Sequence, residues 1–190
     1  GGYDALVKSI EGAEDYPEDG ANAIIKCSIT SDDTVLGITA SSSTPFVLGA
    51  LEQAKKTGAL TGLIICNEPI ELEYIDHMIS VIVGPEVITG STRMKAGTAT
   101  KLVLNMVTTT LMIKLNKTYG NLMVDLKASN KKLWDRGARI IVHLTGLNYD
   151  SSLKLLQAAN GEVKTAIVME ENQCTYEVAL RSLKHVRGNL

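Results

Sequence analysis

The sequence predicts an α/β fold, in which helices cover a parallel sheet, followed by a small all-helical region. Over the first 115 residues, short apolar runs typical of strands alternate with longer segments whose apolar residues recur at helical spacing. From about residue 150 onward only helical spacing is present. We therefore expect one domain over residues 1–144, including a long helix, and a small helical subdomain over residues 145–190.

Composition and charge exclude several classes of protein. Hydrophobic residues make up 45% of the chain and charged residues 21%, as in soluble globular proteins. A formal net charge of −2 gives no reason to expect nucleic acid or an anionic membrane as a partner, and no apolar run reaches the length of a membrane span. The three cysteines and three histidines are widely separated, so we expect reduced thiols in a cytoplasmic protein, and no metal.

The N-terminal segment is expected to form a helix over residues 3–15, which Tyr16 and Pro17 end. Glu11 and Glu14 are three residues apart, so in a helix they share one face. Two carboxylates held close together raise each other's affinity for a proton, which suits acid/base catalysis. The plainer alternative is a solvated acidic helix end, because most glutamates are exposed.

The following elements are expected to alternate between helix and strand. The strand expected at 34–39 is continuous and β-branched, which indicates burial on both faces. Pro45 suits the first turn of the next helix because it has no amide hydrogen to leave unpaired. The predicted helices of this part are 20–27, 45–57 and 93–115, and the other predicted strands are 62–66 and 79–83.

Two loops rich in hydroxyl groups follow predicted strands. Residues 41–44 read Ser-Ser-Ser-Thr, and Ser91 and Thr92 precede the cations Arg93 and Lys95. Ligands of parallel sheets bind beyond the carboxyl ends of the strands, and helix N-termini with hydroxyls attract anions. These loops suit a sugar phosphate, although each one alone is equally well explained as an ordinary helix cap.

The last part of the chain is expected to be helical. One helix is predicted over 129–144, and three short helices follow at 150–159, 163–169 and 175–185. The chain contains no Gly-x-Ser-x-Gly elbow, P-loop or dinucleotide fingerprint, so neither a nucleophile triad nor a nucleotide cofactor is expected. The long apolar helix carries more hydrophobic surface than a thin sheet covers, which predicts a homodimer.

Three segments carry a family resemblance. They read EGAED (11–15), GPEVITGSTRMKAGTATKLVLNM (84–106) and KTYGNLMVDLKASNKKL (117–133). These segments closely resemble the N-acetylmuramic acid 6-phosphate etherase family, whose relative is glucokinase regulatory protein, and the resemblance extends over essentially the whole chain. It implies a sugar isomerase (SIS) domain with a flavodoxin-like parallel sheet, followed by a small, UBA-like helical subdomain.

The resemblance also implies a reaction. Members of the family cleave the D-lactyl ether of N-acetylmuramic acid 6-phosphate to N-acetylglucosamine 6-phosphate and D-lactate, in peptidoglycan recycling. In the open-chain aldehyde, the carbonyl acidifies the C2 proton, the lactyl oxygen on C3 leaves by elimination, and water then adds. This lyase chemistry needs no cofactor, and the implied partner is the sugar-phosphate substrate.

The family's functional residues match several positions of this chain. Glu14 matches one of the two acid/base glutamates, and Glu11 matches a neighbouring substrate contact. The other catalytic glutamate belongs to the first half of the family's SIS domain, upstream of Gly1, so the chain is expected to be a partial SIS domain and an incomplete enzyme. The predicted substrate-binding residues are Glu11, Thr39, Ser41, Ser42, Ser43, Thr44, Ser91, Thr92, Arg93 and Lys95.

One departure from the family pattern favours another function. Etherases usually read Ser-Gly-Arg-Thr-Pro where this chain has Ser-Ser-Ser-Thr-Pro at 41–45, so Ser43 replaces an arginine that binds anions with two parallel hydrogen bonds. The change resembles the regulatory branch, in which serines of this loop hold a sugar phosphate without turning it over. The alternative is therefore a non-catalytic sugar-phosphate-binding regulatory module. A purely structural dimerisation domain ranks third, because it makes no use of the aligned carboxylates and hydroxyls.

Overall fold

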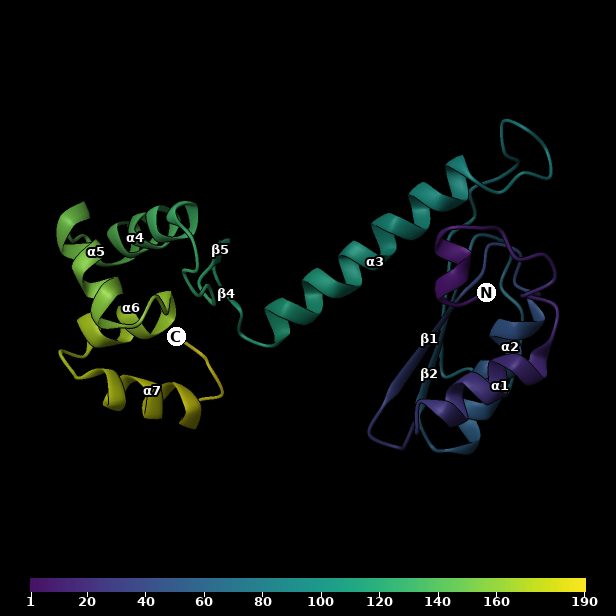
Figure 1. Ribbon diagram of the computed structural model, residues 1–190, viewed down its shortest axis with the longest axis horizontal. Coiled ribbons are helices and arrows are strands. Elements are labelled where there is room, and N and C mark those ends of the chain that lie inside the picture. Colours follow the sequence, from purple (N-terminus) through teal and green to yellow (C-terminus); the bar gives the residue numbers. More distant parts are fainter. The chain divides into compact units, whose positions relative to one another are not determined.

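A three-stranded parallel sheet organises the first half of the chain. The computed structural model describes residues 1–190 and divides into two units, Gly1–Asn105 and Met106–Leu190. In the first unit the strands have the order β1-β2-β3, and β2 pairs in parallel with both neighbours (Figure 1). The strands are β1 (Thr34–Ile38), β2 (Leu60–Ile65) and β3 (His77–Ser80).

Two helices, α1 (Pro17–Lys26) and α2 (Pro45–Lys56), lie together on one face of this sheet (Figure 1). Leu51 of α2 is fully buried against Leu63 and Ile65 of β2, and α1 packs on the outer side of α2. Both helices begin at a proline, whose restricted φ and missing N–H suit the first helical position. The predicted alternation of strands and helices in a parallel α/β unit is therefore confirmed.

The sequence predicted that strand β1 is buried on both faces, and this prediction is wrong. Its alternate residues Val35 and Gly37 are half-buried, whereas Leu36 and Ile38 are 37% and 42% exposed. The reason is that β1 lies at the edge of the sheet and that α1 and α2 are on one face only. The central strand β2, by contrast, is buried from Thr61 onward.

The predicted N-terminal helix over residues 3–15 is wrong. Only a 3₁₀ helix, η1 (Tyr3–Leu6), forms, and a turn follows in which Gly12 has a φ of +72° and the Asp15 amide donates to the Gly12 carbonyl at 3.1 Å. A left-handed glycine interrupts a helix, and Pro17 begins α1 rather than ending an earlier helix. Glu11 and Glu14 therefore do not share a helix face.

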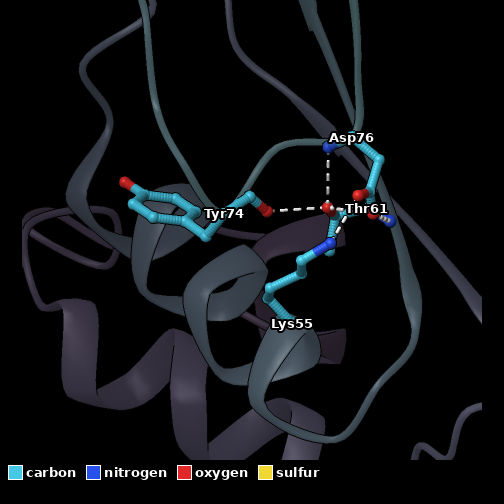
Figure 2. Close-up of polar contacts among 4 residues, drawn as sticks. All are labelled: Lys55, Thr61, Tyr74 and Asp76. Carbon is cyan, nitrogen blue, oxygen red and sulfur yellow. Dashed lines mark hydrogen bonds and ion pairs between the residues drawn. The ribbon is translucent and has the colours of Figure 1, made fainter.

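A polar cluster holds the connection between β2 and β3 (Figure 2). The buried Thr61 hydroxyl donates to the Tyr74 carbonyl at 2.7 Å, and the Asp76 carboxylate accepts from the Thr61 amide at 2.9 Å and from the Lys55 ammonium. The hydrogen bond from Lys55, followed by those from Thr61, lowers the pKa of Asp76 to about 2. The cluster lies near the amino end of β2, at the opposite end of the strand from the loop after β1.

The long helix α3 (Met94–Lys114) agrees with the prediction of 93–115 to within one residue at each end. Many of its apolar side chains are exposed, among them Leu102 at 52%, Met106 at 60% and Ile113 at 52%. None of the helices combines the length and the apolar character that crossing a membrane requires.

The second unit contains the last part of α3, a small hairpin and four short helices. Ile141, Leu156 and Val163 are fully buried at its centre, and a Cβ at Gly137 would lie only 2.8 Å from the Leu156 side chain, so this glycine permits close packing. The four helices match the predictions closely, whereas the hairpin was not predicted. The predicted domain boundary between residues 144 and 145 stays a prediction. The elements are β4 (Thr118–Tyr119), β5 (Leu122–Met123), α4 (Lys131–Thr145), α5 (Tyr149–Ala158), α6 (Val163–Glu171) and α7 (Tyr176–His185).

Candidate functional site

A cavity of about 650 Å³ lies where β1 ends and α2 begins. Four parts of the chain line it: Gly1, the turn that contains Glu14, the loop between β1 and α2, and Thr92 just before α3. The carboxyl end of a parallel strand is where ligands of such sheets bind, and this is the location that the sequence predicted for the site. Six of the predicted site residues meet here, namely Glu14, Thr39, Ser41, Ser43, Thr44 and Thr92.

The hydroxyl groups of the β1–α2 loop form a connected network. The Thr39 hydroxyl lies 2.6 Å from that of Thr44 and 3.3 Å from that of Ser41, and the Ser43 hydroxyl donates to the Ser41 oxygen at 3.2 Å. Thr39 is buried and Thr44 is half-buried, whereas Ser41 and Ser43 are exposed at the rim. The network fixes several donors around one cavity, an arrangement suited to a polar, anionic ligand.

Glu14 reaches the cavity because its backbone is bonded to α2. The Phe46 amide, in the first turn of α2, donates to the Glu14 carbonyl at 3.0 Å. This bond uses one of the helix amides that lack an intrahelical acceptor, and it holds the turn against the hydroxyl loop. The Glu14 side chain is exposed, and Asp15 beside it also lines the cavity. A carboxyl group able to exchange protons with a ligand is thus held next to the hydroxyl network.

Five predicted site residues do not line this cavity: Glu11, Ser42, Ser91, Arg93 and Lys95. Ser42 has a φ of +71°, is 8% exposed, and donates its hydroxyl to the Ser41 carbonyl. The Arg93 Nε donates to the Ser91 hydroxyl at 3.1 Å, and the Lys95 ammonium donates to the Pro85 carbonyl at 2.7 Å. The substrate contacts assigned to these five residues stay predictions.

The N-terminus of α3 is occupied by Glu86, a residue that the sequence did not single out. Its carboxylate accepts hydrogen bonds from the amides of Lys95 and Ala96, each at 3.1 Å, and these bonds lower the pKa of Glu86. A second anion about 4 Å away would be repelled by about 4 kcal/mol at an effective dielectric constant of 20. The sequence signal was weak, because a capping box places the glutamate three residues after the cap, not in a preceding loop.

Two further cavities, of about 580 and 710 Å³, lie within the second unit and contain none of the predicted site residues. Beside the larger one, the buried Lys164 ammonium donates to the carbonyls of Asn116 and Gly188, at 2.5 and 2.9 Å. Its donors are thereby used to join α6 to segments at both ends of the unit. No group of three or more histidine, cysteine or carboxylate side chains is arranged to hold a metal ion.

Comparisons with known proteins agree with the resemblance predicted from the motifs. Residues 1–55 match the family model of the glucokinase regulatory protein N-terminal SIS domain. Relatives with the curated name N-acetylmuramic acid 6-phosphate etherase match the chain over almost all of its length. The relative from Mycolicibacterium smegmatis is 47% identical over 191 residues, which cover 100% of this chain and 64% of the relative.

Two further etherases support the same relationship. The protein from Streptomyces coelicolor is 49% identical over 191 residues (100% of this chain and 61% of the relative), and that from Clostridium acetobutylicum is 52% identical over 180 residues (93% and 59%). The chain spans about three fifths of the length of the curated relatives it matches. Over almost all of its length, this chain is thus similar to proteins named N-acetylmuramic acid 6-phosphate etherase.

Proposed function

We propose that the protein carrying this chain cleaves the D-lactyl ether of N-acetylmuramic acid 6-phosphate, yielding N-acetylglucosamine 6-phosphate and D-lactate. The observation that carries the proposal is the cavity in which Glu14 lies beside the hydroxyl network of the β1–α2 loop. The chain is 47% or more identical to the etherases named above, and this similarity supports the activity.

The cavity suits this chemistry in two respects. Hydroxyls of Thr39, Ser41, Ser43 and Thr44 offer neutral donors to a phosphate, and Glu14 offers a group for one of the two proton transfers. The C2 proton is removed, the C3–O bond breaks with its electron pair going to the lactyl oxygen, and that oxygen takes up a proton. Water then adds its oxygen to C3 while a proton returns to C2, so the net reaction is hydrolysis of the ether.

A second candidate is a regulatory module that binds a sugar phosphate without cleaving it. Two observations favour it: the match of residues 1–55 to the SIS domain of glucokinase regulatory protein, and Ser43 at the position where etherases usually carry arginine. We rank this candidate second because whole-chain identity to named etherases covers more of the sequence.

The two candidates are separated by one assay on the full-length protein that carries this chain. N-acetylmuramic acid 6-phosphate is added, and D-lactate is measured with a stereospecific lactate dehydrogenase. Steady release of D-lactate supports the etherase. Sugar-phosphate binding in calorimetry without any D-lactate would instead support the regulatory module.

The wider setting follows from the same proposal. We propose a cytoplasmic role in the recycling of peptidoglycan amino sugars, which the three free cysteines support. We also propose a homodimer, supported by exposed apolar side chains along α3 such as Leu102 and Met106. Residues 145–190 are proposed as a separate helical subdomain after a domain of residues 1–144.

A further inference from the structure

The Glu86 carboxylate joins the loop before α3 to the first turn of that helix by hydrogen bonds. Its oxygens lie 3.1 Å from the amide nitrogens of Lys95 and Ala96. The Glu86 side chain is half-buried, whereas residues 87–90, which follow it, are exposed. An ionised acceptor at a helix N-terminus forms stronger hydrogen bonds than a neutral cap, so this contact fixes where α3 begins.

The closed loop carries Thr92 to the cavity that contains Glu14. Thr92 lies only two residues before the first residue of α3, so the start of the helix determines its position. Two further bonds hold the same loop: the Lys95 ammonium donates to the Pro85 carbonyl at 2.7 Å, and Arg93 donates to Ser91 at 3.1 Å. The two cations of this segment, Arg93 and Lys95, therefore both form hydrogen bonds to residues of the loop itself.

We propose that Glu86 is a positioning residue for the reaction at this cavity. It holds Thr92 against the ligand, and its negative charge keeps a second anion away from the N-terminus of α3. The phosphate of the substrate is then bound by the β1–α2 loop, at residues 41–44, and not by α3. The inference rests on the proposed etherase function, although its effect on ligand binding is measurable without turnover.

The test compares Glu86→Gln and Glu86→Ala with the wild type in the full-length protein. The KM for N-acetylmuramic acid 6-phosphate is expected to rise about tenfold in the alanine variant, and about threefold in the glutamine variant, which keeps one acceptor oxygen. The kcat is expected to change less than threefold, because Glu86 does not touch the reacting atoms. As a matched control, Glu52→Gln removes an exposed carboxylate that pairs with Lys56 on α2, and it should change neither constant.

Binding of N-acetylglucosamine 6-phosphate, measured by calorimetry, gives an independent result. The proposal expects weaker binding in the order wild type, glutamine variant, alanine variant, with unfolding temperatures measured alongside.

If the alanine variant does not fold, the result for the glutamine variant alone tests the proposal. Unchanged KM and binding would overturn the proposal, and tighter binding would show that α3 is an anion site that Glu86 blocks. A wild type that binds the sugar phosphate but releases no D-lactate would refute the etherase function, and the binding series would still test Glu86.

Discussion

At the scale of single residues, Glu14 is held at the cavity by a backbone hydrogen bond from Phe46 and not by a helix of its own. The turn at Gly12 brings the carboxyl group to the hydroxyl loop, and Asp15 follows it into the cavity. The position of Glu14 therefore depends on the first turn of α2, an element that begins only at Pro45.

Replacing Glu14 tests its role directly. Glu14→Gln keeps the shape of the side chain but removes its ability to exchange a proton, so kcat for D-lactate release should fall by about 10²–10⁴. The KM should stay within a few-fold of the wild type. Glu18→Gln, which changes an exposed glutamate in the first turn of α1, serves as the matched control. Normal turnover by the Glu14 variant would remove Glu14 from the acid/base role.

Sequence patterns located the hydroxyl groups of the site but not all of their neighbours. Ser41, Ser43 and Thr44 were predicted because hydroxyl-rich loops after parallel strands form ligand sites. Thr39 was predicted with the family resemblance, and all four residues line the cavity. Ser42 was predicted with them, yet its left-handed backbone buries its side chain beside Ser41. A residue's φ in an irregular loop depends on tertiary contacts, which local patterns do not record.

At the scale of elements, helices α1 and α2 approach each other backbone to backbone. A Cβ built at Gly20 would lie 1.9 Å from the Phe46 carbonyl oxygen, and one built at Gly49 would lie 2.2 Å from the Pro17 carbonyl oxygen. Only glycine permits this contact, which aligns the start of α2 with the start of α1. Because Phe46 also bonds to Glu14, the close approach supports one wall of the cavity.

Gly49→Ala should destabilise the protein, because the new methyl group meets backbone atoms that cannot rotate away. A loss of about 1–3 kcal/mol in the free energy of unfolding is expected from such overpacking. Gly97→Ala in α3 is the matched change, since a Cβ there meets nothing within 4 Å and alanine favours a helix by about 1 kcal/mol. Denaturant unfolding would contradict the packing argument if both variants shifted in the same direction.

The polar cluster between β2 and β3 predicts an acid-sensitive element. The folded-state pKa of Asp76 is lowered from 3.8 to about 2, so its stabilising contribution is present above about pH 4 and is lost as the pH falls through about 2. Asp76→Asn cannot take up this proton. The wild type should therefore lose more of its unfolding free energy between pH 4 and pH 2 than the variant, as measured by denaturant titration. Parallel pH profiles would refute this assignment.

Most elements were predictable because each has a strong local signal. The three strands and the helices α2 to α7 follow from apolar periodicity and from residues such as Pro45. The hairpin of β4 and β5 was missed because two-residue strands carry no periodicity. The exposed face of β1 was missed because a β-branched sequence does not indicate whether helices cover one face of the strand or both.

At the scale of the whole molecule, α3 carries an unusual amount of exposed apolar surface. Leu102 and Met106 are four residues apart, so they share a helix face, and both are more than half exposed. Side chains of this kind in a contiguous row mark surfaces that bind other proteins. This supports the proposed homodimer.

The homodimer has a measurable mass. Sedimentation equilibrium of the full-length protein should give twice the mass of one chain, and Leu102→Glu should shift it toward one chain mass, because an unpaired charge in an apolar interface is strongly unfavourable. Val178→Glu changes an equally apolar, 39% exposed residue on α7 and should leave the mass unchanged. A single-chain mass for the wild type at micromolar concentration would contradict the proposal.

The overall architecture was predictable because two independent signals agreed. The alternation of strands and helices indicated a parallel α/β unit, and the motif at residues 84–106 indicated the family that the relatives now support. What the sequence did not indicate was how the loop of that motif is used, since the Glu86 carboxylate accepts hydrogen bonds from the first amides of α3. The motif thus predicted which proteins this chain is similar to more reliably than it predicted the individual contacts.

The most direct test of the proposed reaction is to run it in ¹⁸O-labelled water with N-acetylmuramic acid 6-phosphate and the full-length protein. Elimination followed by water addition breaks the bond between C3 and the ether oxygen. Mass spectrometry should therefore find one ¹⁸O at C3 of N-acetylglucosamine 6-phosphate, beyond any exchanged at the aldehyde, and none in the hydroxyl of D-lactate. Label in the D-lactate hydroxyl, or no D-lactate at all, would contradict the account.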